Sequence, residues 1–550
     1  MSKRILIIGG VAGGASAAAR LRRLDEKAAI IMFERSNYIS FANCGLPYYI
    51  GGAIKNHDDL LLQTPESFKK RFNVEVRVKS EVVKINRRDK IVDVLELPTN
   101  RKYTERYDRL ILSPGAEPVK PTIDGIDSNR VFTLRNIADM DRIEEFIKTN
   151  NPQTAIVVGA GYIGLEMAEN LHSRGLSVQV VDVLDQVMPG MDKEMAAFLH
   201  SHLTERGVAL ELGDGVKSLN QKSSSLQVTL KSGEELDCDF VILSVGVRPE
   251  VKLAKEAGLQ IGSFDGIKVN EYLQTSDPDI FAIGDAVEVQ DFILGNIVLI
   301  PLAGPANKQG RMAADNICGR KRTYNGTQGT AILKVFDLTA AMTGANEKVL
   351  AKANVEYEKL YLHQANHAGY YPGAKPMHIK LLFSKPEGKI LGAQIVGQGG
   401  VDKRIDILAV AIRAGMTVFD LQELELAYAP PYGSGKDPVN IAGFVASNIL
   451  DGTVKIKHFT ELQKNDFILD VRTASEFARG NIPNAKNIPV DELRFRLNEL
   501  SNNAAINVYC GVGIRSYIAC RILVQNGFDA CNLSGGYVTY RTVANNGHLR

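Results

Sequence analysis

Two glycine-rich turns, each placed between an apolar run and a helical pattern, constrain the fold of this chain more than any other feature. The first turn covers residues 9–14 after the run ILII (5–8), and the second covers residues 159–164 after AIVV (155–158). A glycine-rich turn in this setting lets the pyrophosphate of a dinucleotide approach the N-terminus of the following helix. Further apolar runs alternate with helical patterns, which is typical of parallel sheets buried on both faces. We therefore predict an α/β protein with two doubly wound nucleotide-binding domains.

The first turn departs from the pattern G-x-G-x-x-G, because Val11 stands where the middle glycine belongs. Glu34 ends the next predicted strand, and a carboxylate there can accept hydrogen bonds from ribose hydroxyls. Taken alone, this turn would also suit a glycine-rich loop of another α/β fold. The nucleotide-binding candidates of this part are Gly9, Gly10, Ala12, Gly13, Gly14 and Glu34.

The second turn matches the pattern completely, with glycines at positions 159, 161 and 164. Asp182 ends the strand that follows, and a carboxylate at this place favours a free ribose 2′-hydroxyl over a 2′-phosphate. The second domain is therefore predicted to bind NADH rather than NADPH. Its candidate residues are Gly159, Gly161, Tyr162, Ile163, Gly164 and Asp182.

Charge and cysteine content exclude several other classes of protein. The 550 residues carry 65 Lys and Arg against 63 Asp and Glu, a net charge of +2, so no nucleic-acid partner is expected. No stretch approaches 18 consecutive apolar residues, which predicts no membrane-spanning helix, and the apolar run at the start is too short for a signal peptide. The six cysteines form no C-x-x-C pair and no zinc pattern. We therefore expect reduced thiols, no metal and a cytoplasmic protein without membrane contact.

Two further segments resemble motifs of the pyridine-nucleotide-disulfide oxidoreductase family. They are DRLILSPGA (108–116), similar to the segment joining the two nucleotide domains, and TSDPDIFAIGD (275–285), similar to the second FAD motif. The resemblance covers about residues 1–320 and implies FAD in the first domain, with the Asp285 carboxylate bonded to the ribityl chain. The further cofactor-binding candidates are Arg35, Ser113, Gly115, Glu166, Gly246, Gly284, Asp285, Pro301 and Ala303.

The segment SFANCGLPYY (40–49) carries one cysteine, Cys44, where the family usually has C-x₄-C, and Tyr49 stands at the second position. It resembles the single-cysteine branch, which comprises coenzyme A-disulfide reductases, NADH oxidases and NADH peroxidases. Such a cysteine can cycle through a mixed disulfide, a sulfenic acid or a persulfide. Proximity to a flavin and a helix N-terminus predicts a lowered pKa for Cys44. The peroxidase-type members have a His in the first glycine turn, whereas this chain has Ala12, which favours a sulfur substrate.

Segments 301–307, 334–337, 367–373, 428–432 and 436–438 resemble coenzyme A-disulfide reductases in particular. The resemblance implies a homodimer whose active site is shared across the interface, with Tyr370 and Tyr428 at the sulfur site as proton donors or orienters. Tyr371 and Tyr432 remain alternatives to them. The candidates for coenzyme A recognition are Arg20, Arg23, Ser40, Asn43, Arg71, Asn307 and Lys436, although each lone cation could equally be a solvated surface charge.

The C-terminal part resembles a single rhodanese domain. LDVR (469–472) opens it, and Cys510 follows the apolar VY (508–509) and begins the loop CGVGIRS (510–516), which closes at a helix. Backbone N–H groups of such a loop can surround a thiolate or persulfide, and Arg515 is expected to brace the loop. The usual G-H-I-P-G-A is here G-N-I-P-N-A, with Asn481 and Asn484 substituted. The other cysteines, Cys238, Cys318, Cys520 and Cys531, are expected to be small buried apolar residues.

These observations predict an α/β chain with two doubly wound nucleotide-binding domains, an α+β dimerisation domain and a C-terminal rhodanese-like α/β domain. The predicted boundaries are 1–115 (FAD), 116–250 (NAD), 251–324 (FAD), 325–448 (dimerisation), 449–460 (linker) and 461–550 (rhodanese). Strands are expected at 330–336 and near 380–383 within the dimerisation domain.

The predicted function is NADH-dependent, FAD-mediated reduction of a coenzyme A persulfide, polysulfide or disulfide through Cys44. The rhodanese domain would supply sulfane sulfur from Cys510 over a flexible connection, which raises its effective concentration. Whether coenzyme A is a substrate or is held tightly stays open. One alternative is an NADH oxidase or peroxidase that uses a Cys44 sulfenic acid. An alternative of another class is a redox-sensing or sulfur-trafficking scaffold.

Overall fold

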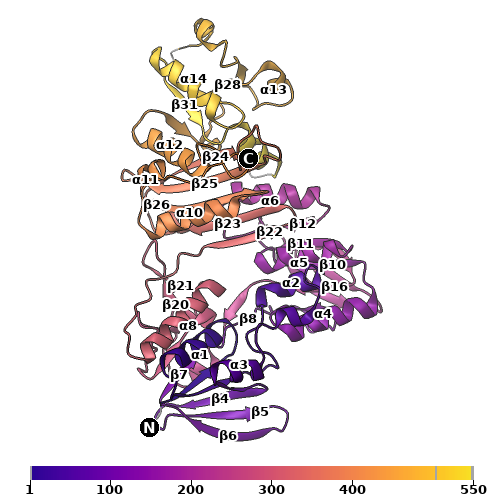
Figure 1. The fold of residues 1–550 in the computed structure, drawn as a ribbon. Coiled ribbons are helices and arrows are strands. Elements are labelled where there is room, and N and C mark those ends of the chain that lie inside the picture. The colour runs from indigo at the N-terminus through magenta and orange to yellow at the C-terminus, as the bar shows by residue number, and fades with distance from the viewer. Residues whose placement is uncertain (1–2, 502–503, 547–550) are drawn as a thin grey trace. The chain divides into compact units, whose positions relative to one another are not determined.

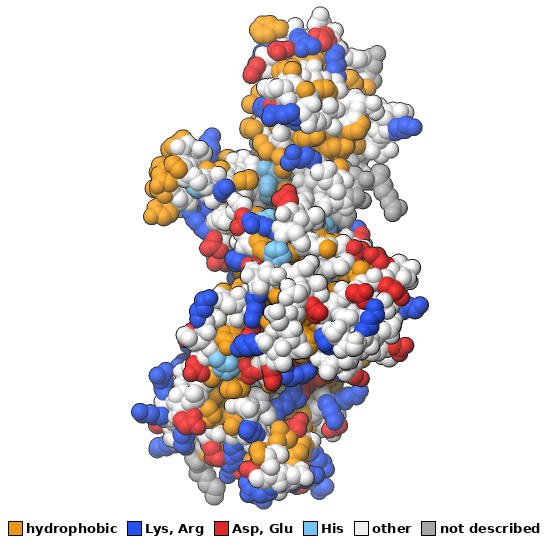
Figure 2. Space-filling model, turned by 90° about the vertical axis from the view of Figure 1, so that its right-hand side faces the viewer, with side chains coloured by type: hydrophobic (Ala, Val, Ile, Leu, Met, Phe, Trp, Pro, Cys, Tyr) orange, Lys and Arg blue, Asp and Glu red, His pale blue; other side chains and the backbone are white. Residues whose placement is uncertain are grey.

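The computed structural model describes residues 3–501 and 504–546, and it confirms the predicted α/β fold class. The chain divides into two compact units (Figure 1), of which one comprises Met1–Val183 and Glu211–Gly329 and the other Leu184–Leu210 and Thr330–Arg550. Among the described residues, no helix has the length and apolar character needed to cross a membrane. On the face shown in Figure 2, basic and acidic side chains are interspersed, in keeping with the small net charge.

The first sheet of unit one is a parallel sheet in the order β19-β7-β1-β2-β3. The apolar runs that suggested buried strands form its centre, with Ile5, Leu6 and Ile7 almost fully buried. Helices α1 and α8 pack against the cluster of apolar side chains on one face. The bounds are β1 (Arg4–Ile8), β2 (Ala29–Phe33), β3 (Glu75–Arg77), β7 (Arg109–Leu112), β19 (Ile280–Ala282), α1 (Ala12–Leu24) and α8 (Ala303–Ile317).

The second sheet of unit one has the order β12-β11-β10-β16-β9 and belongs to the second glycine turn. A small antiparallel pair, β8 with β17, lies at the two places where the chain passes between the two nucleotide domains. The bounds are β8 (Ala116–Pro118), β9 (Val131–Phe132), β10 (Thr154–Val158), β11 (Ser177–Asp182), β12 (Ala209–Leu212), β16 (Phe240–Leu243), β17 (Val247–Pro249) and helix α5 (Tyr162–Ser173).

Unit two contains an antiparallel sheet in the order β22-β23-β26-β25-β24, with β24 at one edge. The strands are β22 (Ala331–Val335), β23 (Leu338–Gly344), β24 (Tyr357–Ala365), β25 (Pro376–Ser384) and β26 (Ile390–Gly397). Its helices include α6 (Lys193–Glu205), α9 (Glu347–Lys352), α10 (Val401–Arg413), α11 (Val418–Glu423) and α12 (Pro438–Leu450). Strands at 331–335 and 376–384 occupy the segments where sequence patterns predicted them.

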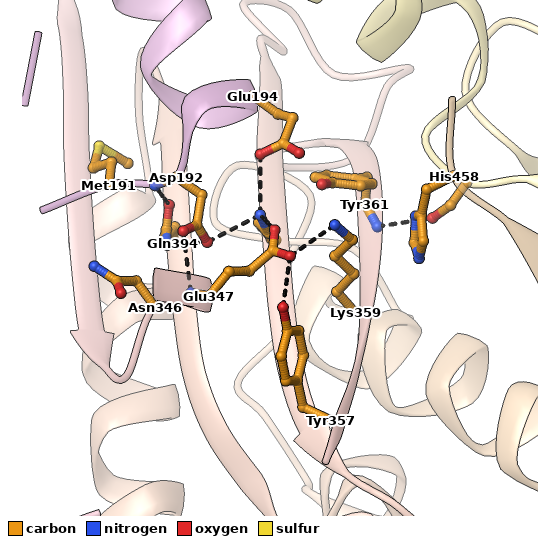
Figure 3. A network of polar contacts seen from close by, with 12 residues as sticks. Met191, Asp192, Glu194, Asn346, Glu347, Tyr357, Lys359, Tyr361, Gln394 and His458 are labelled. Carbon is orange, nitrogen blue, oxygen red and sulfur yellow. Dashed lines mark hydrogen bonds and ion pairs between the residues drawn. The ribbon is translucent and has the colours of Figure 1, made fainter. Parts of the chain in front are cut away.

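A buried ion network fastens α6 to this sheet (Figure 3). The fully buried Lys380 of β25 pairs with Asp192 at 2.9 Å, with Glu194 at 3.1 Å and with Glu347. Glu347 also accepts hydrogen bonds from Lys359 at 2.7 Å and from the Tyr357 hydroxyl at 2.9 Å. Burial opposes the positive charge of Lys380, but the surrounding acidic groups outweigh it and hold the pKa of Lys380 well above its usual value.

The last part of unit two is a parallel sheet in the order β27-β31-β30-β28-β29. The bounds are β27 (Lys455–Lys457), β28 (Phe467–Asp470), β29 (Lys486–Asn487), β30 (Ile506–Tyr509), β31 (Ala530–Leu533), α13 (Ala474–Ala478), α14 (Ile514–Gln525) and α15 (Gly536–Asn545). Residues 449–460 therefore do not form the flexible connection expected, because β27 within them pairs with β31.

Candidate functional site

The first glycine turn has a backbone that only glycine permits. Gly9 has φ +99°, and a Cβ on it would lie 2.0 Å from the Ser113 carbonyl oxygen. A Cβ on Gly14 would lie 1.9 Å from the Gly9 carbonyl oxygen. Helix α1 begins directly after its N-cap residue Val11, whose side chain makes no capping hydrogen bond. The N–H groups of the first turn are thus not capped by that side chain, which suits a pyrophosphate.

The three segments predicted to bind FAD meet at this turn. A Cβ built on Gly13 would lie 3.0 Å from the Ser113 Oγ, and one built on Gly284 would lie 3.8 Å from the same atom. The Gly284 N–H donates to the Gln309 Oε1 at 2.7 Å, which ties the second FAD motif to α8. Burial raises the pKa of Asp285, while the charge of Arg135 opposes that rise. The donors, acceptors and close backbone approaches gathered here fit a flavin dinucleotide.

The strand-end carboxylates occupy matching places in the two nucleotide domains. Glu34 accepts a hydrogen bond from the Gly10 N–H at 3.0 Å, and Asp182 accepts one from the Ala160 N–H at 2.6 Å. A Cβ on Gly161 would meet open space within 4 Å, so the backbone of the second turn is accessible to a phosphate. Both turns therefore fit the dinucleotides predicted for them.

The remaining predicted cofactor residues lie around these turns. Arg35 forms a bidentate ion pair with Glu250 at 2.7 and 2.8 Å, and Arg135 reaches the same carboxylate at 2.9 Å. The guanidinium of Arg35 is thus already paired with a carboxylate of the protein. Gly115 and Gly246 have positive φ values and directly precede β8 and β17, and Pro301 and Ala303 lie at the start of α8.

Cys44 lies in a short 3-10 helix, η1 (Asn43–Gly45), and its side chain is exposed. The protein groups around Cys44 act against the lowered pKa that was predicted for it beside a flavin. Partial burial of the sulfur raises the pKa, and the negative charges of Glu166 and Asp285 raise it further. The following helix α2 (Leu46–Ile50) has only five residues, so its dipole offers little compensation.

Glu166 on α5 is the charged neighbour that connects Cys44 to the second nucleotide domain. Its Oε1 accepts a hydrogen bond from the Tyr48 hydroxyl at 3.3 Å. Burial, and secondarily the charge of Glu169, raise the pKa of Glu166 to about 7. Tyr48 was not among the predicted site residues, because its role depends on a partner on a distant helix. Tyr49, at the position of the missing second cysteine, packs edge-on against His57 with ring centroids 5.9 Å apart.

The candidates for coenzyme A recognition divide into paired and exposed groups. Arg20 pairs with Asp315 at 2.7 Å and is mostly buried, so its charge is already neutralised. Asn307 shares a hydrogen bond with Ser16 and donates to the Ala303 carbonyl at 2.9 Å. The Ser40 N–H donates to the Gly10 carbonyl at 2.8 Å and so joins the Cys44 segment to the first turn. Asn307 is nevertheless exposed, and so are the remaining candidates Arg23, Asn43, Arg71 and Lys436.

In unit two, the structure brings Tyr370 and Tyr428 together. Their hydroxyls share a hydrogen bond of 2.9 Å although both side chains are exposed, and this bond raises the pKa of Tyr370. The alternatives lie in other contacts: Tyr371 packs against His367, and the Tyr432 N–H donates to the Ala429 carbonyl. Of the four candidate tyrosines, Tyr370 and Tyr428 are thus a pair joined through their hydroxyls.

Cys510 directly follows β30, and its side chain is fully buried under its own loop. The Gly513 N–H donates to the Cys510 Sγ at 3.1 Å, and the Ser516 hydroxyl donates to it at 3.4 Å. Hydrogen bonds of this kind stabilise a thiolate or persulfide sulfur. Of the several backbone N–H donors predicted for this loop, the Gly513 N–H reaches the sulfur, and the Ser516 hydroxyl is a donor that was not predicted.

Arg515, which was predicted to brace the loop, has a partner that sequence reasoning missed. It forms a bidentate ion pair with Glu476 of α13, with both distances 2.7 Å. This bonding is the main cause that lowers the pKa of Glu476 to about 2. The signal was present in TASE (473–476), because a Thr followed three residues later by Glu predicts a capping box, which Thr473 and Glu476 do form.

The other cysteines differ in burial. Cys238 and Cys520 are buried as expected, whereas Cys318 and Cys531 are only partly buried. Cys531 also approaches the Asn507 Oδ1 at 3.2 Å, so it is not a purely apolar core residue. Among residues 3–501 and 504–546, no group of three or more His, Cys, Asp or Glu side chains could hold a metal ion.

Comparison with known proteins assigns each part of the chain to a family. Residues 3–310 match the family of pyridine nucleotide-disulphide oxidoreductases, residues 330–436 match the dimerisation domain of that family, and residues 456–542 match rhodanese-like domains. A coenzyme A disulfide reductase of Staphylococcus haemolyticus is 38% identical over 448 residues, which is 81% of this chain and all of that protein.

Two solved structures cover nearly the whole chain. The reduced Bacillus anthracis protein CoADR-RHD is 51% identical, with a TM-score of 0.97 over 99% of both chains. A NAD-dependent persulfide reductase from A. fulgidus is 38% identical, with a TM-score of 0.93 over 98% of this chain and 100% of that one. The matched segments of this chain follow one another as oxidoreductase, dimerisation and rhodanese-like domain, which agrees with the predicted fold class.

Proposed function

Because the chain belongs to the pyridine nucleotide-disulphide oxidoreductase family, and within it to the coenzyme A disulfide reductases, we propose that it is an NADH-dependent flavoprotein reductase of coenzyme A persulfide, polysulfide or disulfide. The observation that carries the proposal is one redox cysteine beside a dinucleotide turn, joined in one chain to a rhodanese loop with its own cysteine. The names of the relatives favour sulfur substrates over the oxidase, peroxidase and scaffold alternatives.

The cofactors are assigned to the two turns. FAD would be held by the first turn, Ser113 and Asp285, and it supplies the two-electron relay between a nicotinamide and sulfur. NADH would bind at the second turn, where Asp182 favours a ribose without a 2′-phosphate. A phosphate beside this carboxylate would meet a negative charge whose Oδ2 is fixed by the Ala160 N–H. This is the reason for preferring NADH to NADPH.

The reaction at Cys44 is a thiol–disulfide exchange followed by a two-electron reduction. The Cys44 thiolate attacks the sulfur attached to coenzyme A, the S–S bond of the persulfide breaks, and the outer sulfur leaves as hydrogen sulfide. Reduction of the resulting mixed disulfide by two electrons releases coenzyme A and restores Cys44. The sum is NADH + H⁺ + CoA–S–SH → NAD⁺ + CoA–SH + H₂S.

Proton supply is assigned to the tyrosine pair. Burial, and secondarily the charges of Glu166 and Asp285, raise the pKa of the Cys44 thiol, so its proton must be taken up when it attacks. The sulfide and the coenzyme A thiolate that leave must each gain a proton, and this calls for a proton donor beside Cys44. In a homodimer with a shared site, Tyr370 and Tyr428 of one protomer would serve Cys44 of the other. Their exposed, mutually bonded hydroxyls support this role. Coenzyme A would be recognised by Arg23, Asn43, Arg71, Asn307 and Lys436 around this site.

The rhodanese loop is assigned the supply of sulfane sulfur. Cys510 would take the outer sulfur of a persulfide donor and pass it to coenzyme A or directly to Cys44. A sulfur-carrying loop has no evident task in the reduction of a plain disulfide, and this favours persulfide or polysulfide as the substrate. The free thiols that this chemistry needs are those of a reducing compartment, so we place the protein in the cytoplasm.

The test compares NADH consumption with coenzyme A persulfide, coenzyme A disulfide, oxygen and hydrogen peroxide. The proposal expects the highest kcat/KM for a sulfur substrate and its loss in Cys44→Ser. Cys510→Ala should keep turnover of added coenzyme A persulfide but lose turnover that starts from a separate sulfane donor. A dominant oxygen rate that survives Cys44→Ser would overturn the sulfur assignment, and purified protein without flavin absorbance would favour a scaffold.

A further inference from the structure

The turn Ser534–Gly535–Gly536, which ends at the first residue of α15, is packed between two parts of unit two. A Cβ on Gly535 would lie 2.8 Å from the Tyr361 Cβ on β24 and 2.1 Å from the Thr539 Oγ1. A Cβ on Gly536 would lie 2.7 Å from the Cys510 carbonyl oxygen. The turn thus touches the antiparallel sheet on one side and the sulfur loop on the other, with no room for a side chain on either glycine.

On the loop side, the first turn of α15 holds the backbone of the Cys510 loop. The Tyr537 N–H donates to the Cys510 carbonyl at 2.7 Å, and the Val538 N–H donates to the Gly511 carbonyl at 3.0 Å. N–H groups in the first turn of a helix have no partner within the helix, so they are available for such contacts. The position of α15 therefore sets the position of the two residues that begin the sulfur loop.

On the sheet side, β24 holds the same turn and helix. The His363 Nε2 shares a hydrogen bond of 2.8 Å with the Thr539 Oγ1, and the Tyr361 N–H donates to the Ser534 Oγ at 3.2 Å. These contacts are buried and link residues that are more than 170 positions apart in the chain.

His363 is also held by side chains of β25 and α6. Its Nδ1 shares a hydrogen bond of 2.7 Å with the Nδ1 of His378 on β25, and the His378 ring stacks on Phe198 of α6 with centroids 4.0 Å apart. Burial, with the neighbouring His378, lowers the pKa of His363 to about 3, so the ring is neutral near pH 7. A neutral imidazole has one donor and one acceptor nitrogen, and here each nitrogen has one neighbouring side-chain partner.

We propose that His363 and Thr539 are positioning residues for sulfur transfer at Cys510, because they hold α15 against β24 and α15 in turn holds the Cys510 loop. This inference rests on the sulfur-transfer role proposed for Cys510. It makes the antiparallel sheet part of the sulfur-transfer machinery, and not only a dimerisation element.

The reaction that this positioning serves is a persulfide exchange. The Cys510 thiolate attacks the outer sulfur of a donor R–S–SH, the donor S–S bond breaks, and R–SH leaves after taking up a proton. Cys510 becomes a persulfide, so one sulfur atom moves and no external oxidant or reductant is consumed. The Gly513 N–H at 3.1 Å from the Sγ stabilises the thiolate only while the loop keeps this geometry.

The test uses the full-length, flavin-loaded protein and three variants. Thr539→Val removes the hydroxyl while keeping the shape of the side chain, and Thr539→Ser keeps the hydroxyl. Thr542→Val is the matched control, since the Thr542 hydroxyl donates only to the Val538 carbonyl within α15. Two quantities are measured at Cys510 by peptide mass spectrometry: the pH profile of alkylation by iodoacetamide, and the rate of persulfide formation from glutathione persulfide.

Thr539→Val is expected to raise the pH midpoint of alkylation and to slow persulfide formation about tenfold, the effect of losing one buried hydrogen bond. Thr539→Ser and Thr542→Val should stay close to wild type, and reduction of coenzyme A disulfide at Cys44 should be unchanged in all three. Unchanged alkylation and persulfide formation in Thr539→Val would overturn the inference.

Ser534→Ala is a milder second variant for the case that Thr539→Val fails to fold, and it should change both quantities in the same direction; wild-type values for it would also overturn the inference. If wild-type Cys510 accepts no sulfur from the persulfide, the proposed sulfur supply fails. The alkylation profile still decides whether His363 and Thr539 position the loop.

Discussion

Replacement of Lys380 by Met tests how the ion network of unit two contributes to stability. Lys380 is fully buried and bonded to Asp192, Glu194 and Glu347, so Lys380→Met keeps most of the volume and leaves these carboxylates without their common cation. Breaking one side of a buried ion pair typically costs about 3–5 kcal/mol.

The pKa of one partner, Glu194, gives a similar free energy for the interaction. Glu194 is mostly buried, and the charges of Lys380 and Lys359, acting against its burial, lower its pKa from 4.5 to about 2. A difference of 2.5 between these pKa values corresponds to about 3 kcal/mol. For a unit of about 250 residues, a loss of about 3–5 kcal/mol lowers the midpoint of thermal unfolding by roughly 6–20 °C.

The lowered pKa of Glu194 also predicts how the loss of stability in Lys380→Met depends on pH. The pKa of Glu194 is lowered in the folded state, so its stabilising contribution is fully present above pH 4.5 and is lost as the pH falls towards 2. Thermal unfolding followed by calorimetry between pH 3 and pH 8 should therefore show a large deficit for Lys380→Met at pH 7 that shrinks below pH 4.5. The control is Lys455→Met, because Lys455 forms an exposed pair with Asp529 at 2.8 Å, and its loss should hardly change stability. An equal deficit for both variants, or one that does not depend on pH, would refute the reasoning.

Three shorter predictions concern the sites. Asp182→Ala should lower the preference for NADH over NADPH in kcat/KM by about tenfold or more, since a 2′-phosphate would no longer face a carboxylate; an unchanged ratio would remove the reason for assigning NADH. Glu166→Gln should raise the unfolding midpoint at pH 8 but not at pH 4, because the raised pKa of Glu166 makes the fold lose stability as the pH rises from 4.5 to about 7; calorimetry at the two pH values checks this. Glu476→Gln should loosen the brace on Arg515 and slow sulfur loading of Cys510 by about tenfold, without effect on NADH-dependent reduction at Cys44, as loading and turnover assays would show.

The sequence predicted those features that depend on short spacings. The glycine turns at 9–14 and 159–164 each follow a strand and open a helix, and both carboxylates that end the next strands lie against their turn. The loop donors at Cys510 likewise follow from neighbours in the chain. In such cases, one local backbone conformation is enough to bring the groups together.

Features that depend on distant partners could not be predicted. Burial raises the pKa of Cys44, and Glu166 and Asp285, which approach it only after the sheets have formed, raise it further. Arg20 was predicted to bind a ligand, but in the folded chain it pairs with Asp315. Residues 449–460 were predicted to be a linker, but pairing with β31 makes part of this segment a strand. None of these partners lies within the local window that sequence periodicity describes.

The turn at Ser534 also covers the margin of a sheet. Strand β24 lies at the edge of its five-stranded sheet, and unpaired edge groups readily recruit strands of other molecules. Here one such amide, that of Tyr361, is bonded to the Ser534 hydroxyl. A chain cut after Leu450 would lack Ser534 and so lose this hydrogen bond. We expect such a chain to aggregate through the exposed edge of β24 more readily than the intact protein.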